Sequence, residues 1–481
     1  MAENADTSAT ASTTTVNGTS KNPLQPKNYE IAGTHPDSRI LFRDVRILDS
    51  TGREPYPGDV LIKGERIVEV GTVSNIESLI RDPTVRVFNG RGRTLMPGLC
   101  DAHTHLSWNG GNLDALGELG VEEHTLLTMR AAQCYLDSGY TMCWGAASAK
   151  PRLDVVIRDA INAGDIYGPR CLANGQEIAK VDGELVPGIT AYANTPEEIR
   201  EVIRGHVKLG VDQIKLSISG ESVTETRAAT DCYFSAEDME AAVDEAHKHG
   251  KRVCTHARAR ESVKLSILHG VDVIFHASYI DDEGMDLLEK AKDRVVVVPA
   301  LNWLYATLYE AAAFGYPQAV AEKAGYKAEL ETAIKGLKEM HRRGITVLPG
   351  GDYGFAWTPH GTYARDLEHF VKLLGFTPME AILAATAEGG KLFMREHELG
   401  KIQPGYYADC ILVNGNPLED IAILQDHSKL DVITINGRVH KSSPLEHYRP
   451  IPIAGEGDGR ESVIVPELKF LTIERKMQVD L

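Results

Sequence analysis

Two histidines separated by one residue stand in the segment Asp101-Ala102-His103-Thr104-His105, directly after Met96-Pro97-Gly98-Leu99. Residues two apart in a β-strand share one face of the strand, so the imidazoles of His103 and His105 can point the same way. Two imidazole nitrogens on one face are suitable ligands for a metal such as zinc. The alternative is a pair of unrelated histidines on a solvated strand.

Further residues able to bind a metal follow apolar or β-branched runs at Lys215, His256, His276 and Asp352. Each alone has an ordinary structural explanation. A single histidine at a strand end is usually a hydrogen-bonded structural residue, and an aspartate there often caps the next helix. Lys215 could pair with a buried carboxylate. Together the candidates favour one site, because the carboxyl ends of barrel strands meet at one face, where barrel enzymes keep their catalytic groups.

The elements that would position these residues alternate along residues 97–402. Helix-like stretches, such as those opened by Ser235 and by the capping box Thr377-Pro378-Met379-Glu380, separate the strand-like runs. The eight strand candidates are 99–106, 140–146, 170–175, 212–218, 252–257, 271–277, 295–301 and 346–351. This alternation predicts an α/β fold, with a (β/α)8 TIM barrel over residues 97–402 as the catalytic domain.

Short β-branched runs occur on both sides of the barrel segment, for example Val60-Leu61-Ile62 and Val432-Ile433-Thr434-Ile435. They predict one small β-sandwich-like domain formed from both ends of the chain, residues 38–96 plus 403–444. Residues 1–37 are rich in Ser, Thr, Asn and Ala and are expected to form a flexible arm. Residues 445–481 form a C-terminal tail.

The sequence resembles the amidohydrolase superfamily, in particular the imidazolonepropionase-like group that contains ochratoxinase, Xaa-Pro dipeptidases, and the phenylurea and molinate hydrolases. The resemblance is carried by the Met-Pro-Gly-Leu entry to the two histidines, by the divided β-domain, and by the closing motif Gly400-Lys401-Ile402-Gln403-Pro404-Gly405. Gly220-Glu221-Ser222-Val223 departs from the Gly-Gly-Val expected in the peptidase members. Gly351 stands where the group more commonly has Thr.

The resemblance implies two divalent cations held by His103, His105 and Asp352 at the first, His256 and His276 at the second, and Lys215 as a bridge. The lysine would be N-carboxylated by CO2. An ammonium group has no lone pair and repels a dication, whereas a carbamate offers two anionic oxygens. Imidazole-rich ligation suits Zn²⁺, with Co²⁺, Mn²⁺ or Fe²⁺ also compatible.

The implied reaction is hydrolysis of a C–N bond in an amide, carbamate or urea. The metals would lower the pKa of a bound water from about 16 toward 7, and the metal-bound hydroxide would attack the carbonyl. Asp352 would accept the proton and pass it to the departing nitrogen. Two alternatives remain: a decarboxylase of an aromatic acid on the same barrel, and a metal-free scaffold or binding protein of this fold.

Aromatic residues follow the same strand ends and predict a pocket for a flat or apolar small molecule. The predicted substrate-binding residues are Trp108, Trp144, Arg258, Tyr279, Trp303, Tyr353 and Trp357. The arginine would pair with a substrate carboxylate. The alternatives are that the rings pack loops against the barrel and that Arg258 forms a salt bridge at its rim.

The overall composition argues against some classes of binding partner. The 481 residues carry a formal net charge of −17, which disfavours nucleic acid and anionic membrane surfaces as partners. Seven cysteines without a paired CxxC spacing indicate reduced thiols. The chain shows neither an export signal nor an apolar stretch of membrane-spanning length. We therefore expect a cytoplasmic enzyme, and the family resemblance suggests a homo-oligomer.

Overall fold

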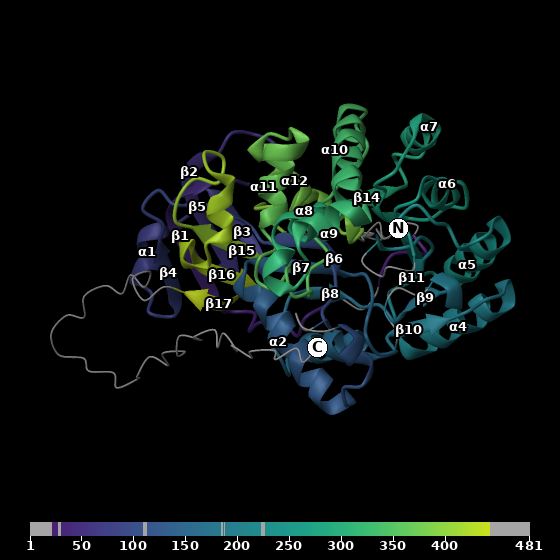
Figure 1. The fold of residues 1–481 in the computed structure, drawn as a ribbon. Coiled ribbons are helices and arrows are strands. Elements are labelled where there is room, and N and C mark those ends of the chain that lie inside the picture. Colours follow the sequence, from purple (N-terminus) through teal and green to yellow (C-terminus); the bar gives the residue numbers. More distant parts are fainter. Residues whose placement is uncertain are drawn as a thin grey trace, which may run out of the picture. The chain divides into compact units, whose positions relative to one another are not determined.

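The computed structural model describes residues 22–26, 30–108, 113–183, 186, 188–222 and 227–442. Its first large sheet joins the two ends of the chain, with the strand order β17-β16-β15-β5-β1-β2-β3 and β4 paired to β1 (Figure 1). The strands are β1 (Arg39–Ile47), β2 (Tyr56–Lys63), β3 (Arg66–Gly71), β4 (Val85–Asn89), β5 (Thr94–Pro97), β15 (Cys410–Val413), β16 (Leu430–Ile435) and β17 (Arg438–Ser442). The short helix α1 (Ile76–Arg81) lies between β3 and β4.

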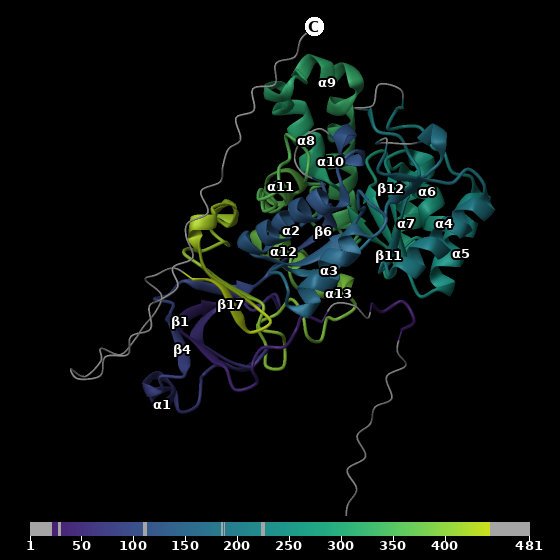
Figure 2. The same ribbon diagram turned by 90° about the horizontal axis from the view of Figure 1, so that it is seen from below.

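The two ends meet where β5 pairs antiparallel with β15, so that Pro97 stands opposite Cys410. In Figures 1 and 2 the early strands, in purple, and the late strands, in yellow, accordingly lie side by side. Alternate side chains of these strands are buried in a shared apolar core that includes Phe42, Ile62 and Leu412. The strand runs predicted at both ends of the chain are thus confirmed as one sheet.

The central region contains parallel strands: β6 (Leu99–Thr104), β7 (Tyr140–Gly145), β8 (Arg170–Leu172), β9 (Glu177–Ala179), β10 (Thr190–Tyr192), β11 (Gln213–Ser217), β12 (Arg252–Ala257), β13 (Val273–His276) and β14 (Val296–Val298). They form two sheets, in the orders β6-β7-β8 and β10-β9-β11-β12-β13-β14. Seven of the eight predicted strand positions carry one of these strands, and the eighth, 346–351, forms a parallel bridge from Val347 to Val297. β9 and β10, of three residues each, were not predicted.

Individual hydrogen bonds connect the two parallel sheets in place of continuous ladders. The Ala102 N–H donates to the Pro349 carbonyl at 3.1 Å, which joins β6 to the 346–349 segment. On the other side, the Gln213 side chain donates to the Leu172 carbonyl at 3.0 Å and so links β11 to β8. These links bring the ends of β6, β11, β12 and β13 and the 346–352 segment into one neighbourhood.

Helices follow most of the parallel strands, as expected for βα units. They are α2 (Val121–Asp137), α3 (Leu153–Ala163), α4 (Pro196–Leu209), α5 (Ala236–Lys248), α6 (Arg260–Leu268), α7 (Asp282–Lys290), α8 (Leu301–Tyr309), α9 (Gln318–Ala324), α10 (Tyr326–Arg342), α11 (Arg365–His369), α12 (Pro378–Ala384) and α13 (Ala387–Leu392). The predicted capping box at Thr377 and Glu380 is confirmed at the start of α12, where the Thr377 side chain accepts from the Glu380 N–H.

Part of the segment predicted to be a flexible arm is packed. Ile31 is 4% exposed, and the Ala32 N–H donates to the Asn162 carbonyl at 2.7 Å. The compositional argument fails here because one buried isoleucine and a few backbone hydrogen bonds suffice to hold a short stretch. Residues 1–21 and 27–29 of the predicted arm and the predicted tail, residues 445–481, lie outside the described residues.

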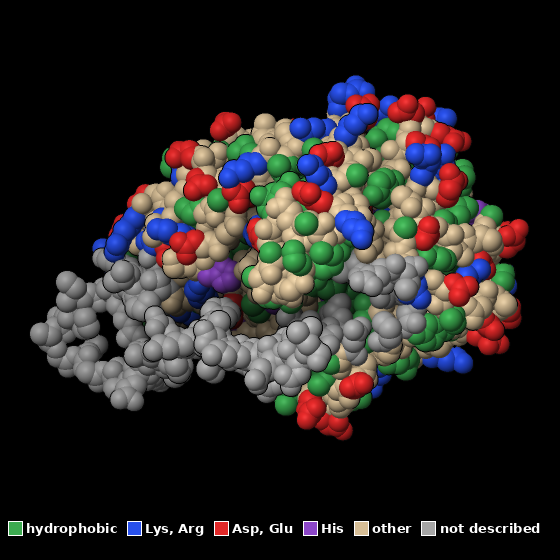
Figure 3. All heavy atoms as spheres, viewed as in Figure 1, with side chains coloured by type: hydrophobic (Ala, Val, Ile, Leu, Met, Phe, Trp, Pro, Cys, Tyr) green, Lys and Arg blue, Asp and Glu red, His purple; other side chains and the backbone are tan. Residues whose placement is uncertain are grey.

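The charged surface and the state of the cysteines are as expected from the amino-acid composition. On the face shown in Figure 3, acidic and basic side chains are intermixed. All seven cysteines are free thiols, as predicted. In the part of the chain that the structure describes, no helix combines the length and the apolar character needed to cross a bilayer.

Candidate metal centre

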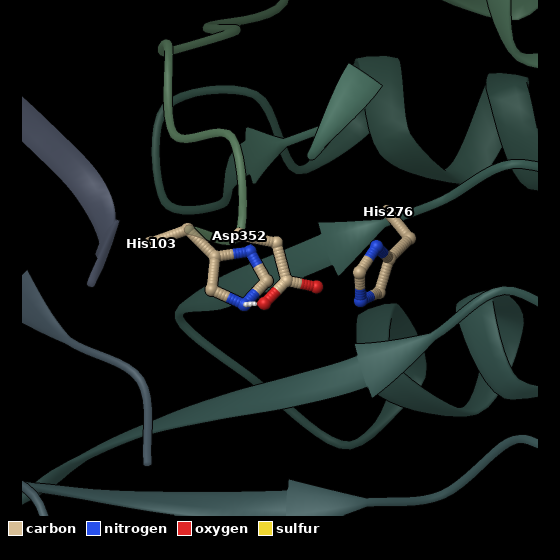
Figure 4. A group of neighbouring side chains, drawn as sticks. All are labelled: His103, His276 and Asp352. Carbon is tan, nitrogen blue, oxygen red and sulfur yellow. Dashed lines mark ion pairs between the residues drawn. The ribbon is translucent and has the colours of Figure 1, made fainter. Parts of the chain in front are cut away.

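The first group of candidate ligands gathers around the Asp352 carboxylate. His103 lies in β6 and His105 just beyond it, and their Nε2 atoms are 3.6 and 3.0 Å from the same Asp352 oxygen, Oδ1. Ligand atoms of His103, His276 and Asp352 all lie within 4.8 Å of one another. Figure 4 shows the Asp352 carboxylate between the two imidazole rings. These three buried side chains form a potential metal-binding group.

The second pair of imidazoles lies beside this group. His256 is the second-last residue of β12, and His276 is the last residue of β13. Nδ1 of His256 is 2.9 Å from Nε2 of His276. Nε2 of His256 is 3.2 Å from the Gly220 carbonyl. A carbonyl only accepts, so this contact requires the proton on Nε2 and leaves a lone pair on Nδ1, the atom that faces His276.

His105 is oriented in the same manner by a backbone carbonyl. Its Nδ1 is 3.2 Å from the Ala147 carbonyl, which places the proton on Nδ1 and leaves the lone pair on Nε2, toward Asp352. Orientation of a metal-binding histidine by a hydrogen bond from its other ring nitrogen is the usual arrangement in metalloproteins. Neither carbonyl was predicted, because a backbone acceptor leaves no signal in the residue type.

The proton positions on these side chains indicate whether the cluster can accommodate a cation. With the protons placed as above, His105 Nε2 and Asp352 Oδ1 are two acceptors only 3.0 Å apart. Such lone pairs repel one another unless a cation or a proton lies between them. His103 Nδ1 and His276 Nδ1 are also buried without a hydrogen-bond partner among the described residues. The donor set of neutral imidazoles and a carboxylate therefore fits a divalent cation.

Lys215 of β11 lies in the same cluster and is 1% exposed. Its Nζ lies 4.6 Å from the centroid of the Phe275 ring, and that ring stacks on His103 at 3.9 Å. The lysine charge is also among the causes that depress the pKa of His103, His105, His256 and His276, although burial is the largest cause. Burial thus favours neutral imidazoles, the form that binds metals.

The backbone at two of the candidates is strained. His276 has φ 73° and Asp352 has φ 60°, values in the left-handed region that non-glycine residues rarely adopt. Such conformations persist where the surrounding structure enforces them, and they gather at functional sites. Both residues stand at strand ends, where the chain turns away and the side chain is directed into the cluster.

The glycines before Asp352 allow close packing. A Cβ on Gly350 would lie 2.6 Å from the His103 nitrogen, and one on Gly351 would lie 2.4 Å from the Tyr353 ring and 2.7 Å from Asp366 Oδ2. The departure from Thr at position 351 therefore has a physical reason in this chain. The Tyr353 ring occupies the space that a larger side chain at position 351 would need.

Comparison with known proteins agrees with this geometry. Residues 94–440 match the Amidohydrolase family. The chain belongs to the amidohydrolase family. Ochratoxinase of Aspergillus niger is 26% identical over 450 residues, which span 87% of this chain and 90% of that protein. Imidazolonepropionase of Treponema denticola is 21% identical over 436 residues, spanning 83% and 97%.

A solved structure of a Xaa-Pro dipeptidase with bound methionine in the active site superposes on this amidohydrolase with a TM-score of 0.71. It is 26% identical and covers 84% of this chain and 100% of its own. The resemblance predicted from the Met-Pro-Gly-Leu entry and the paired histidines is thus confirmed. Membership of the amidohydrolase family and the relatives named here support a general assignment as a hydrolase of C–N bonds.

Several of the predicted aromatic residues form a connected series beside the metal-binding group. Trp108 stacks on His105 with ring centroids 3.5 Å apart. Phe355 contacts Trp108 at 4.8 Å and Trp303 at 4.2 Å, and Trp303 stacks on Trp357 at 5.4 Å. In this amidohydrolase the series begins at a candidate ligand and extends away from it.

Two predicted pocket residues lie elsewhere. The Trp144 ring is fully buried under the Arg252 guanidinium at 4.1 Å, and Arg252 begins β12, four residues before His256. At about 3.3 Å per residue, that position is well below the end of the strand. Tyr353 is also fully buried, and its hydroxyl donates to the Tyr363 carbonyl at 3.1 Å. Both rings lie in the apolar core of this amidohydrolase and outside the aromatic series that begins at His105, and their assignment to the pocket stays a prediction.

Arg258 is fully buried and paired with carboxylates of the chain itself. Its guanidinium lies 2.7 Å from Glu329 and 2.5 Å from Glu221. This arrangement favours the salt-bridge alternative over contact with a substrate carboxylate. Tyr279, whose N–H donates to the Arg258 carbonyl, is half-buried, and burial raises the pKa of its hydroxyl.

Proposed function

We propose that this amidohydrolase is a binuclear metal-dependent hydrolase that cleaves the C–N bond of an amide, carbamate or urea in a small aromatic or apolar substrate. The observation that supports this proposal most directly is the convergence of four imidazoles, one carboxylate and one lysine from segments far apart in sequence. The seven parallel strands at predicted positions and the 346–349 segment would form the eight units of a (β/α)8 barrel that presents them.

The proposed ligands divide between two cations as the family resemblance implies. His103, His105 and Asp352 would hold one, and His256 and His276 the other. Lys215 would bridge them as a carbamate. Its burial among imidazoles supports this role, since an ammonium group there would repel two dications. Zn²⁺ suits the imidazole-rich set, and Co²⁺, Mn²⁺ and Fe²⁺ remain compatible with it.

When bound, the cations would lower the pKa of a water from about 16 toward 7 and polarise a substrate carbonyl. Asp352 would act as the proton carrier. Burial by itself raises the pKa of this carboxyl, whereas neighbouring positive charge lowers it, so a bound cation beside Asp352 would keep the carboxyl ionised. An ionised Asp352 can accept a proton from the attacking water and deliver it to the departing nitrogen.

The aromatic series supports an aryl or bulky apolar group in the substrate. Trp108, Phe355, Trp303 and Trp357 continue outward from His105, so a flat group beside the scissile bond would meet ring faces and edges. Relatives named for ochratoxinase and Xaa-Pro dipeptidase activity make N-acyl amino acids the first class to test. Aryl ureas and carbamates come next.

The experiment is a metal analysis followed by a substrate screen on the same purified protein. Two equivalents of a divalent cation per chain, and release of an amine from an N-acyl amino acid, aryl urea or carbamate, are the expected results. Chelation should abolish turnover and re-addition of Zn²⁺ should restore it. One metal with release of CO2 from an aromatic acid would indicate the decarboxylase, and no metal at all would indicate a scaffold.

A further inference from the structure

Arg258 joins three separate elements through charge pairs that the proposed reaction does not use. Its guanidinium contacts Glu221, which follows β11, and Glu329 in the first turn of α10. The Tyr326 hydroxyl, also in α10, donates to Glu221 Oε1 at 2.5 Å. Arg258 and Glu329 are fully buried, and Glu221 is 7% exposed. A buried arginine between two carboxylates fixes the relative positions of the segments that carry them.

Arg258 contacts both neighbours of Gly220 in the sequence, Ser219 as well as Glu221. Its backbone N–H donates to the Ser219 hydroxyl oxygen at 2.8 Å, while its side chain pairs with Glu221. Residues 219 and 221 are therefore both held by Arg258, and the peptide between them carries the Gly220 carbonyl. That carbonyl is the acceptor that sets the tautomer and ring orientation of His256.

Gly220 lies in a segment with little room to adjust. A Cβ at this position would lie 2.2 Å from the Ala228 carbonyl oxygen, and Ser219 forms a β-bridge with Cys232. The backbone is thus enclosed by the 228–232 segment on one side and held by Arg258 on the other. A change in the contact between Arg258 and Glu221 would be transmitted to the position of the carbonyl.

We infer that Arg258 is a positioning residue for His256, acting through Ser219 and Glu221 on the Gly220 carbonyl. The inference rests on the proposed function, in which His256 is a metal ligand. Loss of the arginine leaves two buried carboxylates uncompensated, and loss of the Glu221 charge leaves Arg258 paired with Glu329 alone and residue 221 no longer held by an ion pair. In either case the hydrogen bond that holds the His256 lone pair toward the cluster weakens, and cation affinity falls.

The test measures Co²⁺ binding to the full chain by chelator competition and by the visible absorption of the bound cobalt. In Arg258→Met and in the isosteric Glu221→Gln, one of the two cobalt equivalents should bind roughly 10–100-fold more weakly, the usual effect of removing an orienting group. Its absorption should change as an imidazole leaves the cobalt. Arg258→Lys should fall between these variants and the unmodified protein. If Arg258→Met does not fold, Glu221→Gln carries the test.

The matched control is Arg170→Met. Arg170 is also fully buried and pairs with Asp409 at 2.8 Å, in a contact that joins β8 to the sheet formed by the two ends of the chain. This variant should lose thermal stability and keep both cobalt affinities. Unchanged affinities in Arg258→Met and Glu221→Gln, with only a higher KM, would overturn the inference and favour substrate contact. Absence of cobalt binding by the unmodified protein would instead overturn the proposed function.

Discussion

The indole ring of Trp108 lies flat on the imidazole of His105, with centroids 3.5 Å apart and planes inclined by 7°. The Trp108 carbonyl is held in turn by His360, whose Nε2 lies 2.6 Å from it. His105 is therefore fixed on its face by a ring and at its edge by the Ala147 carbonyl.

Replacing Trp108 by Leu should weaken this constraint. Stacked aromatic pairs contribute roughly 1 kcal/mol beyond their buried area, which corresponds to about a fivefold loss in cation affinity or kcat/KM. Chelator competition and steady-state kinetics measure the two effects. Trp357→Leu is the control, because this indole donates to Thr307 and does not stack on a candidate ligand. It should raise KM for aryl substrates only. Unchanged metal binding and turnover in Trp108→Leu would contradict the role of the stack.

Gly351→Thr should destabilise the protein. The new Cβ would lie 2.4 Å from the Tyr353 ring, so the ring must move within a packed core, at a cost of about 1–3 kcal/mol. Urea unfolding measures this difference. Gly205→Ala is the control, since nothing lies within 4 Å of a Cβ there and the residue is in the middle of α4. That change should stabilise the protein by about 0.5–1 kcal/mol. Equal stability of Gly351→Thr and the unmodified protein would refute the packing argument.

Asp154 predicts a pH dependence of stability. Burial raises the pKa of this carboxyl from 3.8 to about 7, although the neighbouring Ser148 and Ser107 hydroxyls oppose the shift. Between these values the folded protein holds a proton that the unfolded chain has released, so the free energy of unfolding falls as the pH rises from about 4 to 7. The loss attributable to Asp154 is at most roughly 4 kcal/mol.

Asp154→Asn should remove this contribution, so that the variant is more stable than the unmodified protein at pH 8 and similar to it at pH 4. Thermal unfolding across this pH range provides the measurement. Asp244→Asn, at an exposed position of α5, is the matched control and should leave the profile unchanged. If Asp154→Asn and the unmodified protein show parallel pH profiles, the carboxyl is not protonated in the folded protein.

Lys215→Ala should lose both bound cations and turnover, because the carboxylate of the cluster, Asp352, is assigned to the first cation and the proposed bridge between the two cations is gone. Addition of formate, acetate or propionate should restore part of both, since a small carboxylate can replace the carbamate oxygens. Metal analysis and kinetics with and without the acids measure the rescue. Lys180→Ala, which removes a half-buried lysine paired with Asp238, is the control. Full activity of Lys215→Ala would exclude a bridging lysine.

The positions of the parallel strands and of the six candidate ligands could be predicted together, because the candidate ligands lie in or directly after strand-like runs of the sequence. Each candidate directly follows an apolar run, and parallel strands bring such positions to one edge. The residue types then restrict the chemistry, as His103 and His105 show by their spacing alone. A different signal, β-branched runs separated by turns, predicted the sheet shared by the two ends of the chain.

The directions of neighbouring side chains could not be predicted in this way. Trp144 lies on a predicted strand, yet its ring packs under Arg252 because the inward face of a strand includes positions below its end. Arg258 shares the expected face with His256, but its partners Glu221 and Glu329 come from segments distant in sequence. The sequence indicates where a strand ends. Whether a charged side chain such as that of Arg258 is already paired with a carboxylate depends on contacts between segments that are distant in sequence.

The most direct measurement is anomalous X-ray diffraction from crystals of the Zn²⁺-loaded protein at the zinc edge. We expect two anomalous peaks, one bounded by His103, His105 and Asp352 and the other by His256 and His276, with carbamate density on Lys215 between them. No peak at these residues in a protein shown to bind zinc, or a peak only at some other part of the chain, would contradict the proposal of a binuclear hydrolase.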